Sequence, residues 1–201
     1  MTVLITGAAG GVAAYLRPAL DSTYELRSTD RTPGDGVITG DLTDAGFARD
    51  VCTGADTVVH LAADAGATSI GEDVVPYPCC AYGVVKVFTE NMGRLYADQH
   101  GLSVICLRLG GVRDEPMARS WLPGWLSGPD LVRLVTGALT TGVHFGVYHG
   151  VSANTGSIWR HDRARADLGY QPRDDSAAFV GTVPDDIPAQ PAPGVRIAHL
   201  T

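Results

Sequence analysis

Tyr82 and Lys86 are the two side chains of this sequence whose types and spacing are best suited to chemistry. Lys86 is the single lysine of the chain, whereas arginine supplies the other 14 positive side chains. Because four residues make about one helical turn, the phenol and the amine should point from the same helix face. An ammonium beside a phenol favours the phenolate form. The spacing therefore predicts a proton donor or acceptor for use near neutral pH, with Lys86 tuning Tyr82.

A glycine-rich turn near the N-terminus predicts a dinucleotide site. Residues 6–13 read TGAAGGVA and lie between a predicted strand and a predicted helix, which is the context that a dinucleotide fingerprint needs. Gly7 permits the tight turn, and Gly10 lets the backbone approach a pyrophosphate bound at the helix N-terminus. Ala13 replaces the third glycine of the fingerprint. Gly11 and Val12 open the helix, so their N–H groups, with that of Ala9, are predicted to face the cofactor.

Asp30 supports the same interpretation. It ends the second predicted strand, where a carboxylate can accept hydrogen bonds from the adenosine ribose hydroxyls. A 2′-phosphate would be repelled there, so NAD is predicted in preference to NADP. Arg31, the next residue, softens that preference.

Strands and helices alternate along the chain. Short apolar runs predict strands, and helical periodicity predicts helices between them. This order predicts an α/β fold, a Rossmann-like doubly wound parallel sheet of about six strands with helices on both faces. The predicted strands are 3–6, 24–29, 37–40, 57–61, 103–109 and 143–148, and the predicted helices are 10–20, 45–52, 81–99, 129–139 and 158–168.

Two of the predicted helices show one-sided patterns. Helix 81–99 carries its charged residues off an apolar stripe, and helix 129–139 carries Asp130 in its first turn. The stripe of helix 81–99 consists of Val85, Phe88, Met92, Leu95 and Tyr96. The inward residues predicted for helix 129–139 are Leu131, Leu134, Val135 and Ala138.

Residues 1–180 are predicted to form one NAD(P)-binding domain, in which about residues 110–180 form a small substrate-side portion. Prolines recur from Pro184 onwards, so residues 181–201 are predicted to form an extended tail.

Composition restricts the partners and the compartment. A net charge of −7 argues against a nucleic-acid or acidic-membrane surface. The sequence has no run of 18 apolar residues and no basic signal-peptide start, so we expect a cytoplasmic protein and no membrane partner. The four cysteines show no C-x-x-C spacing and the histidines are scattered, so no metal is predicted.

The order of these motifs resembles the short-chain dehydrogenase/reductase superfamily, in its extended NAD-dependent epimerase/dehydratase branch. Within that branch the chain is most similar to uronate dehydrogenase-type proteins, over about residues 2–176. The resemblance implies that Tyr82 and Lys86 are the acid/base pair. It also implies cofactor contacts from two segments, GDL at 40–42 and HLAA at 60–63. The residues added to the predicted cofactor site in this way are Asp41, Leu42, Leu61, Ala62, Ala63 and Lys86.

The chain departs from that family between residues 64 and 81. Members place a helix and a strand there, and the strand ends at a catalytic Ser or Thr. Here the interval is too short, so one helix–strand unit is predicted to be missing. Ser69, or Thr68, is the candidate for the catalytic hydroxyl, because Ser69 lies 13 residues before Tyr82. The lost helix would normally flank a dimer interface, so a monomer or an altered dimer is expected.

A second departure concerns the substrate. Members that bind a uronate carboxylate carry an arginine five residues before the position of Trp125, where this chain has Ser120. Arg119 is one position away. The resemblance therefore gives weak support to a sugar-acid substrate.

Three functions are consistent with these residues. The first is an NAD-dependent oxidoreductase acting on a small hydroxy or carbonyl substrate, in which Tyr82 transfers the proton, Lys86 tunes it and holds the ribose, and Ser69 or a backbone amide steadies the substrate oxygen. The second is a non-redox isomerase, lyase or cyclase on the same fold. The third is a catalytically inactive NAD(H)-binding module.

Overall fold

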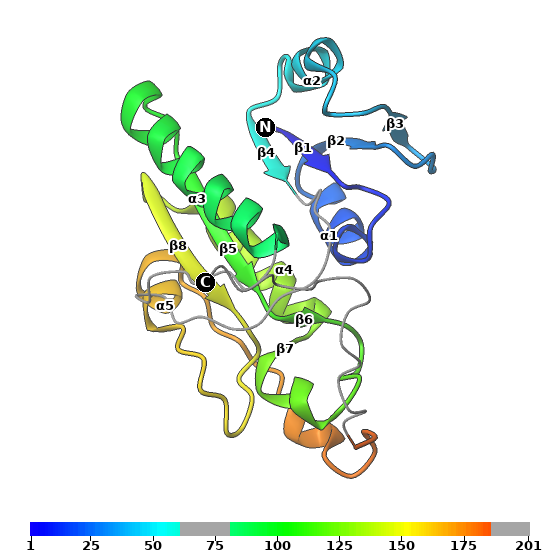
Figure 1. The fold of residues 1–201 in the computed structure, drawn as a ribbon, viewed down its shortest axis with the longest axis vertical. Coiled ribbons are helices and arrows are strands. Elements are labelled where there is room, and N and C mark those ends of the chain that lie inside the picture. The colour runs from blue at the N-terminus through cyan, green and yellow to red at the C-terminus, as the bar shows by residue number, and fades with distance from the viewer. Residues whose placement is uncertain (61–80, 186–201) are drawn as a thin grey trace, which may run out of the picture.

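The computed structural model describes residues 1–60 and 81–185 of the 201-residue chain. Its first part is a four-stranded parallel sheet in the order β3-β2-β1-β4, accompanied by two helices (Figure 1). The central strand is β1, whose Val3, Leu4 and Ile5 are fully buried. The elements are β1 (Thr2–Thr6), α1 (Gly11–Asp21), β2 (Glu25–Asp30), β3 (Val37–Thr39), α2 (Ala45–Cys52) and β4 (Thr57–His60).

The second part is built on a separate parallel pair, β5 with β8, and a short parallel pair, β6 with β7. Helix α3 lies along β5 and β8 (Figure 1). The elements are α3 (Ala81–His100), β5 (Val104–Leu109), β6 (Gly111–Val112), η1 (Arg119–Gly124), β7 (Trp125–Leu126), α4 (Gly128–Thr140), β8 (Phe145–Gly150), α5 (Asp162–Leu168) and η2 (Ser176–Phe179).

The predicted α/β architecture with parallel strands is confirmed, but the strands do not form one continuous sheet. Within residues 1–60 and 81–185, β4 and β5 are not hydrogen-bonded to each other. The break falls at the place where the sequence predicts a missing helix–strand unit. Direct pairing of β5 with β4, which would have moved the Tyr82 helix inward by one strand spacing, does not occur.

One hydrophobic core nevertheless spans the break. Helix α1 from the first part packs on α4 from the second. Buried Leu16 and Leu131 belong to the same cluster, which also receives Val59 from β4 and Leu107 from β5. The two sheets are therefore held together by their helices. As predicted, α4 turns Leu131, Leu134 and Val135 inward.

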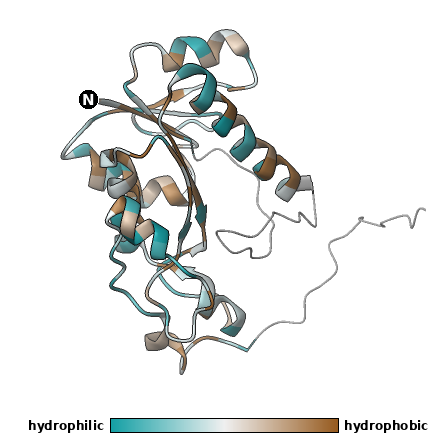
Figure 2. Cartoon of the chain, turned by 90° about the vertical axis from the view of Figure 1, so that its left-hand side faces the viewer, coloured by the Kyte–Doolittle hydropathy of each residue, from teal (hydrophilic) through white to brown (hydrophobic). Residues whose placement is uncertain are grey.

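Helix α3 does not pack as its apolar stripe suggested. Val85, Phe88, Leu95 and Tyr96 are exposed, Phe88 to 63% (Figure 2 shows the hydropathy of the helix). The face with Glu90, Gly93 and Ala97 meets the sheet instead, because its small residues allow close approach: a Cβ added to Gly93 would come within 2.9 Å of the Val104 side chain. The prediction that the stripe marks the packed face was wrong.

Helix α5 begins at Asp162 rather than at residue 158. The Trp159 N–H donates to the Ser157 hydroxyl at 3.2 Å, and the Arg160 carbonyl lies 3.0 Å from His149 Nδ1. These contacts hold the segment in a turn, because side-chain hydrogen bonds to the backbone compete with helix formation. The helix ends at Gly169, whose φ of +65° is left-handed, as predicted for its C-cap.

No helix in residues 1–60 or 81–185 combines the length and the apolar character needed to span a membrane.

Candidate functional site

The glycine turn has the form that a diphosphate-binding loop requires. Gly7 adopts a left-handed φ of +69°, and its carbonyl accepts the Gly10 N–H at 3.0 Å. Gly10 then caps α1 without a side-chain hydrogen bond. A Cβ added to Gly11 would meet nothing within 4 Å, so the helix start is open to a ligand. The exposed first turn therefore fits the phosphates of a dinucleotide.

Asp30 closes this turn from the neighbouring strand. Its two carboxylate oxygens accept the backbone N–H of Thr32 at 2.8 Å and that of Ala9 at 3.0 Å. These hydrogen bonds, led by that from Thr32, lower the pKa of Asp30, and Arg31 adds to the effect. The carboxylate stays charged and half-buried at the loop. Each oxygen keeps a lone pair with which it can accept a ribose hydroxyl.

The next predicted contact segment lies beside Asp30. The Gly40 N–H donates to the Asp30 carbonyl at 3.0 Å, which brings Asp41 and Leu42 to the same sheet edge. Asp41 is exposed and accepts the Thr43 N–H at 2.9 Å, a bond that lowers the pKa of its carboxyl group. Leu42 is partly buried. The structure thus brings the predicted adenosine-side residues together.

Tyr82 and Lys86 point from the same face of α3, as their spacing predicted. The Lys86 Nζ lies 5.3 Å from the centroid of the Tyr82 ring, within the range of a cation–π contact. Both side chains are partly buried. Burial lowers the pKa of the Lys86 ammonium.

His60 belongs to the same region. It begins the segment 60–63 that the resemblance implied as a cofactor contact, but no chemical role was predicted for its imidazole. It ends β4, and its Nδ1 lies 2.7 Å from the hydroxyl of Thr6, its partner at the end of β1. His60 is exposed in part, yet loss of hydration around its ring lowers its pKa, and the positive charge of Lys86 lowers it further. The Lys86 ammonium is thus close enough to the end of β4 for its charge to act on His60. A titratable residue at the carboxyl end of a parallel strand was the signal that could have identified His60.

The other predicted site residues, Ser69 with its alternative Thr68 and the segment Leu61, Ala62 and Ala63, lie outside the described residues.

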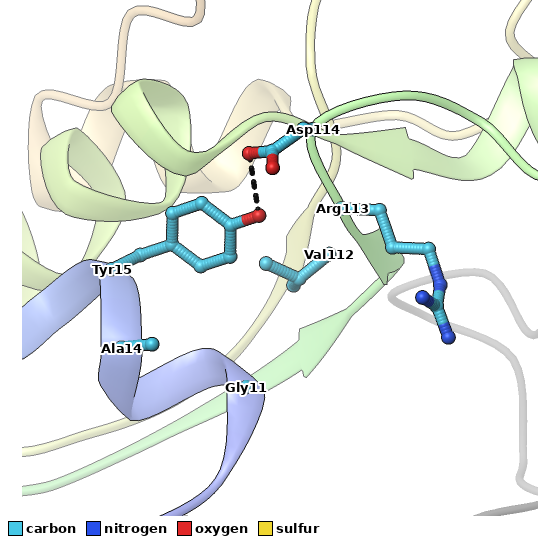
Figure 3. Close-up of a pocket in the computed structure, with 6 residues that line it drawn as sticks. All are labelled: Gly11, Ala14, Tyr15, Val112, Arg113 and Asp114. Carbon is cyan, nitrogen blue, oxygen red and sulfur yellow. Dashed lines mark hydrogen bonds between the residues drawn. The ribbon is translucent and has the colours of Figure 1, made fainter.

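A cavity of ≈ 420 Å³ opens beside the start of α1 (Figure 3). It is lined by Gly11 and Tyr15 from α1 and by Arg113 and Asp114 from the loop after β6. The Tyr15 hydroxyl donates to Asp114 Oδ1 at 2.7 Å, and the Trp125 ring N–H donates to the Arg113 carbonyl at 2.8 Å. These bonds fix the loop against the helix. The sequence analysis did not predict the cavity, because it depends on a contact between residues 99 positions apart.

The segment that carries Trp121 and Trp125, formed by η1 and β7, is mainly a packing element. Trp125 is buried and meets Phe179 edge to face at 5.3 Å. Arg119 is paired with Asp185 at 2.6 Å. Its guanidinium is thus already neutralised by a carboxylate of this chain.

Taken together, the glycine turn, the acid that ends β2 and the Tyr82–Lys86 face define a dinucleotide-binding protein of the Rossmann type. The model of the NAD dependent epimerase/dehydratase family matches residues 3–73. The uronate dehydrogenase of Pseudomonas putida is 28% identical, over 95% of this chain and 89% of its own length. The NAD-dependent glucose-6-phosphate dehydrogenase of Haloferax volcanii is 25% identical, over 88% of this chain and 95% of its own length.

A solved structure gives the same result. The crystal structure of the uronate dehydrogenase from Agrobacterium tumefaciens is 26% identical and superposes with a TM-score of 0.85, covering 93% of this chain and 91% of that one. These comparisons support the predicted resemblance: the chain is similar to proteins of the NAD-dependent epimerase/dehydratase branch of the short-chain dehydrogenases, the uronate dehydrogenases among them.

The comparison also supports a shortened chain. The alignment with the Pseudomonas putida protein extends over 244 positions, whereas this chain has 201 residues. At least 43 of those positions thus lack a residue here. The break between β4 and β5 is where such a loss was predicted.

Proposed function

We propose that this protein is an NAD-dependent oxidoreductase that interconverts a hydroxyl and a carbonyl group on a small sugar-like substrate. The observation that carries the proposal is the position of Lys86, over the Tyr82 ring and within electrostatic reach of His60, at the end of the strand paired with β1. This arrangement supports a proton-transfer role for Tyr82 and Lys86 near the predicted diphosphate loop. The relatives are dehydrogenases of uronates, glucose 6-phosphate and arabinose.

The cofactor would be held by the first sheet. Gly10, Gly11 and Val12 present backbone N–H groups to the diphosphate, and Asp30 accepts the ribose hydroxyls. Bound NAD supplies the hydride acceptor. Asp41 and Leu42 border the adenine side, Arg31 lies next to Asp30, and the open turn with Gly7 and Ala9 admits the phosphates.

The proton chemistry would belong to α3. Tyr82 takes the proton of the substrate hydroxyl during oxidation and returns it during reduction. The Lys86 ammonium stabilises negative charge on the phenol oxygen and donates to the nicotinamide-side ribose. His60, whose lowered pKa keeps it neutral, adds no competing positive charge beside Lys86. Ser69, with Thr68 as the alternative, remains our candidate for the hydroxyl that steadies the substrate oxygen.

The substrate side would be formed within about residues 110–180 of a domain that comprises residues 1–180. Arg119, which lies next to the position where a uronate-binding arginine is expected, is occupied by Asp185. Both side chains of this pair are exposed, so the ion pair is weak. Aldoses, sugar phosphates and uronates all remain candidates that turnover measurements can separate.

The test combines binding and turnover. NADH binding is measured by fluorescence, and NAD reduction is followed with aldoses, sugar phosphates and uronates. We expect NADH to bind, NAD to be reduced with at least one sugar, and Tyr82→Phe to lower kcat by roughly 100- to 10,000-fold. Failure of the protein to bind any dinucleotide would exclude the proposal.

The break in the sheet favours one alternative, a module that binds NAD(H) without catalysis. It predicts NADH binding that is indifferent to Tyr82→Phe and no turnover with any sugar. A non-redox enzyme would instead convert a sugar without net reduction of NAD.

A further inference from the structure

The break between β4 and β5 separates the two halves of the proposed active site. The residues proposed to hold NAD lie on β1–β4 and α1, whereas Tyr82 and Lys86 lie on α3, which packs on β5 and β8. No described strand joins β4 to β5 and sets the distance between these halves. Among the described residues, contacts with β5 and β8 hold α3 and so direct its side chains.

Glu90 makes the most specific of these contacts. It lies one helical turn after Lys86 and two turns after Tyr82, so the three side chains share one face. Arg108 of β5 donates from Nε to Glu90 Oε1 and from Nη2 to Oε2, both at 2.8 Å. Each side chain is about one-fifth exposed, at 20% for Glu90 and 21% for Arg108. Such a two-pronged pair fixes orientation as well as distance.

Neighbouring contacts place Glu90 firmly over the strand. Cys106 lies two residues before Arg108, and burial raises the pKa of its thiol to about 11, an effect to which the Glu90 charge adds. Further along α3, Gly93 lies close against Val104. The Ala97 carbonyl lies 3.0 Å from His144 Nε2.

The contacts at Gly93 and Ala97 hold the C-terminal half of α3, whereas apolar packing holds its N-terminal end less firmly. Val84, Val85 and Phe88 are more than half exposed, so the apolar stripe does not lock the helix at the end that carries Tyr82 and Lys86. A small rotation would swing the phenol oxygen away from the cofactor. A displacement of about 1 Å can cost on the order of 100-fold in rate.

We infer that Glu90 and Arg108 are positioning residues, whose ion pair sets the rotation of α3 and so aims Tyr82 and Lys86 at the strand ends that carry the cofactor loop. Neither residue touches the reacting atoms. The expected effect on kcat rests on the proposed function. Its structural consequence, the effect of the Lys86 charge on the pKa of His60, does not require turnover.

The experiment compares Glu90→Gln with the unaltered protein in three measurements. We expect kcat to fall roughly 10- to 100-fold, while the Kd for NADH changes less than twofold because the nucleotide is held by the other sheet. In an NMR titration, the pKa of His60 should rise towards its ordinary value as Lys86 moves away. Lys86→Met removes the ammonium altogether, so it shows the pKa that His60 has without any effect of the Lys86 charge. The charge-reversed double variant Glu90→Arg with Arg108→Glu should recover part of kcat.

Asp98→Asn is the matched control, because it removes the exposed pair with Arg94 on the same helix and leaves the Arg94 guanidinium over the Phe145 ring of β8. It should leave all three measurements unchanged. If Glu90→Gln does not fold, Arg108→Lys is measured instead. It keeps the positive charge but cannot make the two parallel hydrogen bonds to Glu90. A folded variant that keeps both kcat and the pKa of His60 would overturn the inference. If the unaltered protein binds NADH but oxidises nothing, the oxidoreductase proposal fails, and the His60 titration alone decides whether Glu90 positions the helix.

Discussion

Lys86 and His60 come from opposite sides of the divided sheet, yet the ammonium of one acts on the imidazole of the other. Lys86 is carried by α3 on the β5–β8 side, whereas His60 ends β4 and is hydrogen-bonded to Thr6. The pKa of His60 therefore depends on how the two halves of the site are placed relative to each other.

This relationship predicts a pH-dependent stability. Burial and Lys86 lower the pKa of His60 in the folded state, so the unfolded chain binds a proton more readily than the folded one. The contribution of neutral His60 is fully present above the ordinary histidine pKa of about 6.5 and is lost as the pH falls through the lower folded value. The unaltered protein should therefore lose stability between pH 7.5 and pH 5 through this residue.

His60→Asn should flatten that part of the profile, measured as urea unfolding at both pH values. His100→Gln, at the exposed C-terminal end of α3, is the control and should retain the slope. An unchanged slope in His60→Asn would contradict the assignment.

Lys86→Arg tests why the chain keeps its single lysine here. The amine is a compact charge in a partly buried place, whereas a guanidinium is larger, planar and not equivalent to it. We expect kcat to fall roughly 10- to 100-fold, with the far-ultraviolet circular dichroism unchanged. Arg94→Lys, the reverse exchange on the exposed side of the same helix, should leave kcat as it is. Full activity in Lys86→Arg would show that any cation suffices.

Asp30→Asn tests the choice of cofactor. The amide matches the carboxylate in shape and keeps an oxygen for the Ala9 or Thr32 N–H, but it carries no charge. We expect NADH to bind several-fold more weakly, because hydrogen bonds to a charged acceptor are stronger than neutral ones. NADPH should bind better than before, since repulsion of the 2′-phosphate is removed.

The measurement is the ratio of the two dissociation constants, with Asp35→Asn in the following exposed turn as the control. A ratio that does not move in Asp30→Asn would exclude a ribose contact by this residue.

Most of the fold was predictable because its signals are local. The strand–glycine turn–helix unit, the acid ending β2 and the Tyr82–Lys86 spacing each lie within a few residues, and the structure contains them where they were expected. The predicted helix ends agree with the observed ones within about one residue where a cap defines them, as Gly169 does for α5.

What failed depends on contacts between distant segments. The apolar stripe of α3 predicted the wrong packed face, because the Glu90–Arg108 pair and the close approach at Gly93 turn the face with Glu90 and Gly93 towards β5. His60 could not be connected with Lys86 from the sequence, since their proximity arises across the break in the sheet.

Asp130 gives the largest expected effect on stability. Its carboxylate is fully buried at the start of α4, where it is paired with Arg133. It also accepts the backbone N–H groups of Arg173 at 2.9 Å and Asp174 at 3.0 Å, which ties the segment after α5 to the core. Asp130→Ala leaves those two N–H groups and the Arg133 charge without their acceptor, so the free energy of unfolding should fall by about 3–5 kcal/mol.

Asp98→Ala removes the carboxylate of an exposed pair instead and should cost no more than about 1 kcal/mol. Urea unfolding of both variants gives the comparison, and NADH binding at low denaturant shows whether the first sheet stays folded. Because α4 shares its core with α1, whose first turn is the proposed diphosphate site, unfolding of the α4–α5 region should weaken NADH binding as well. Equal free-energy losses in the two variants would mean that the buried carboxylate contributes no more than a surface pair.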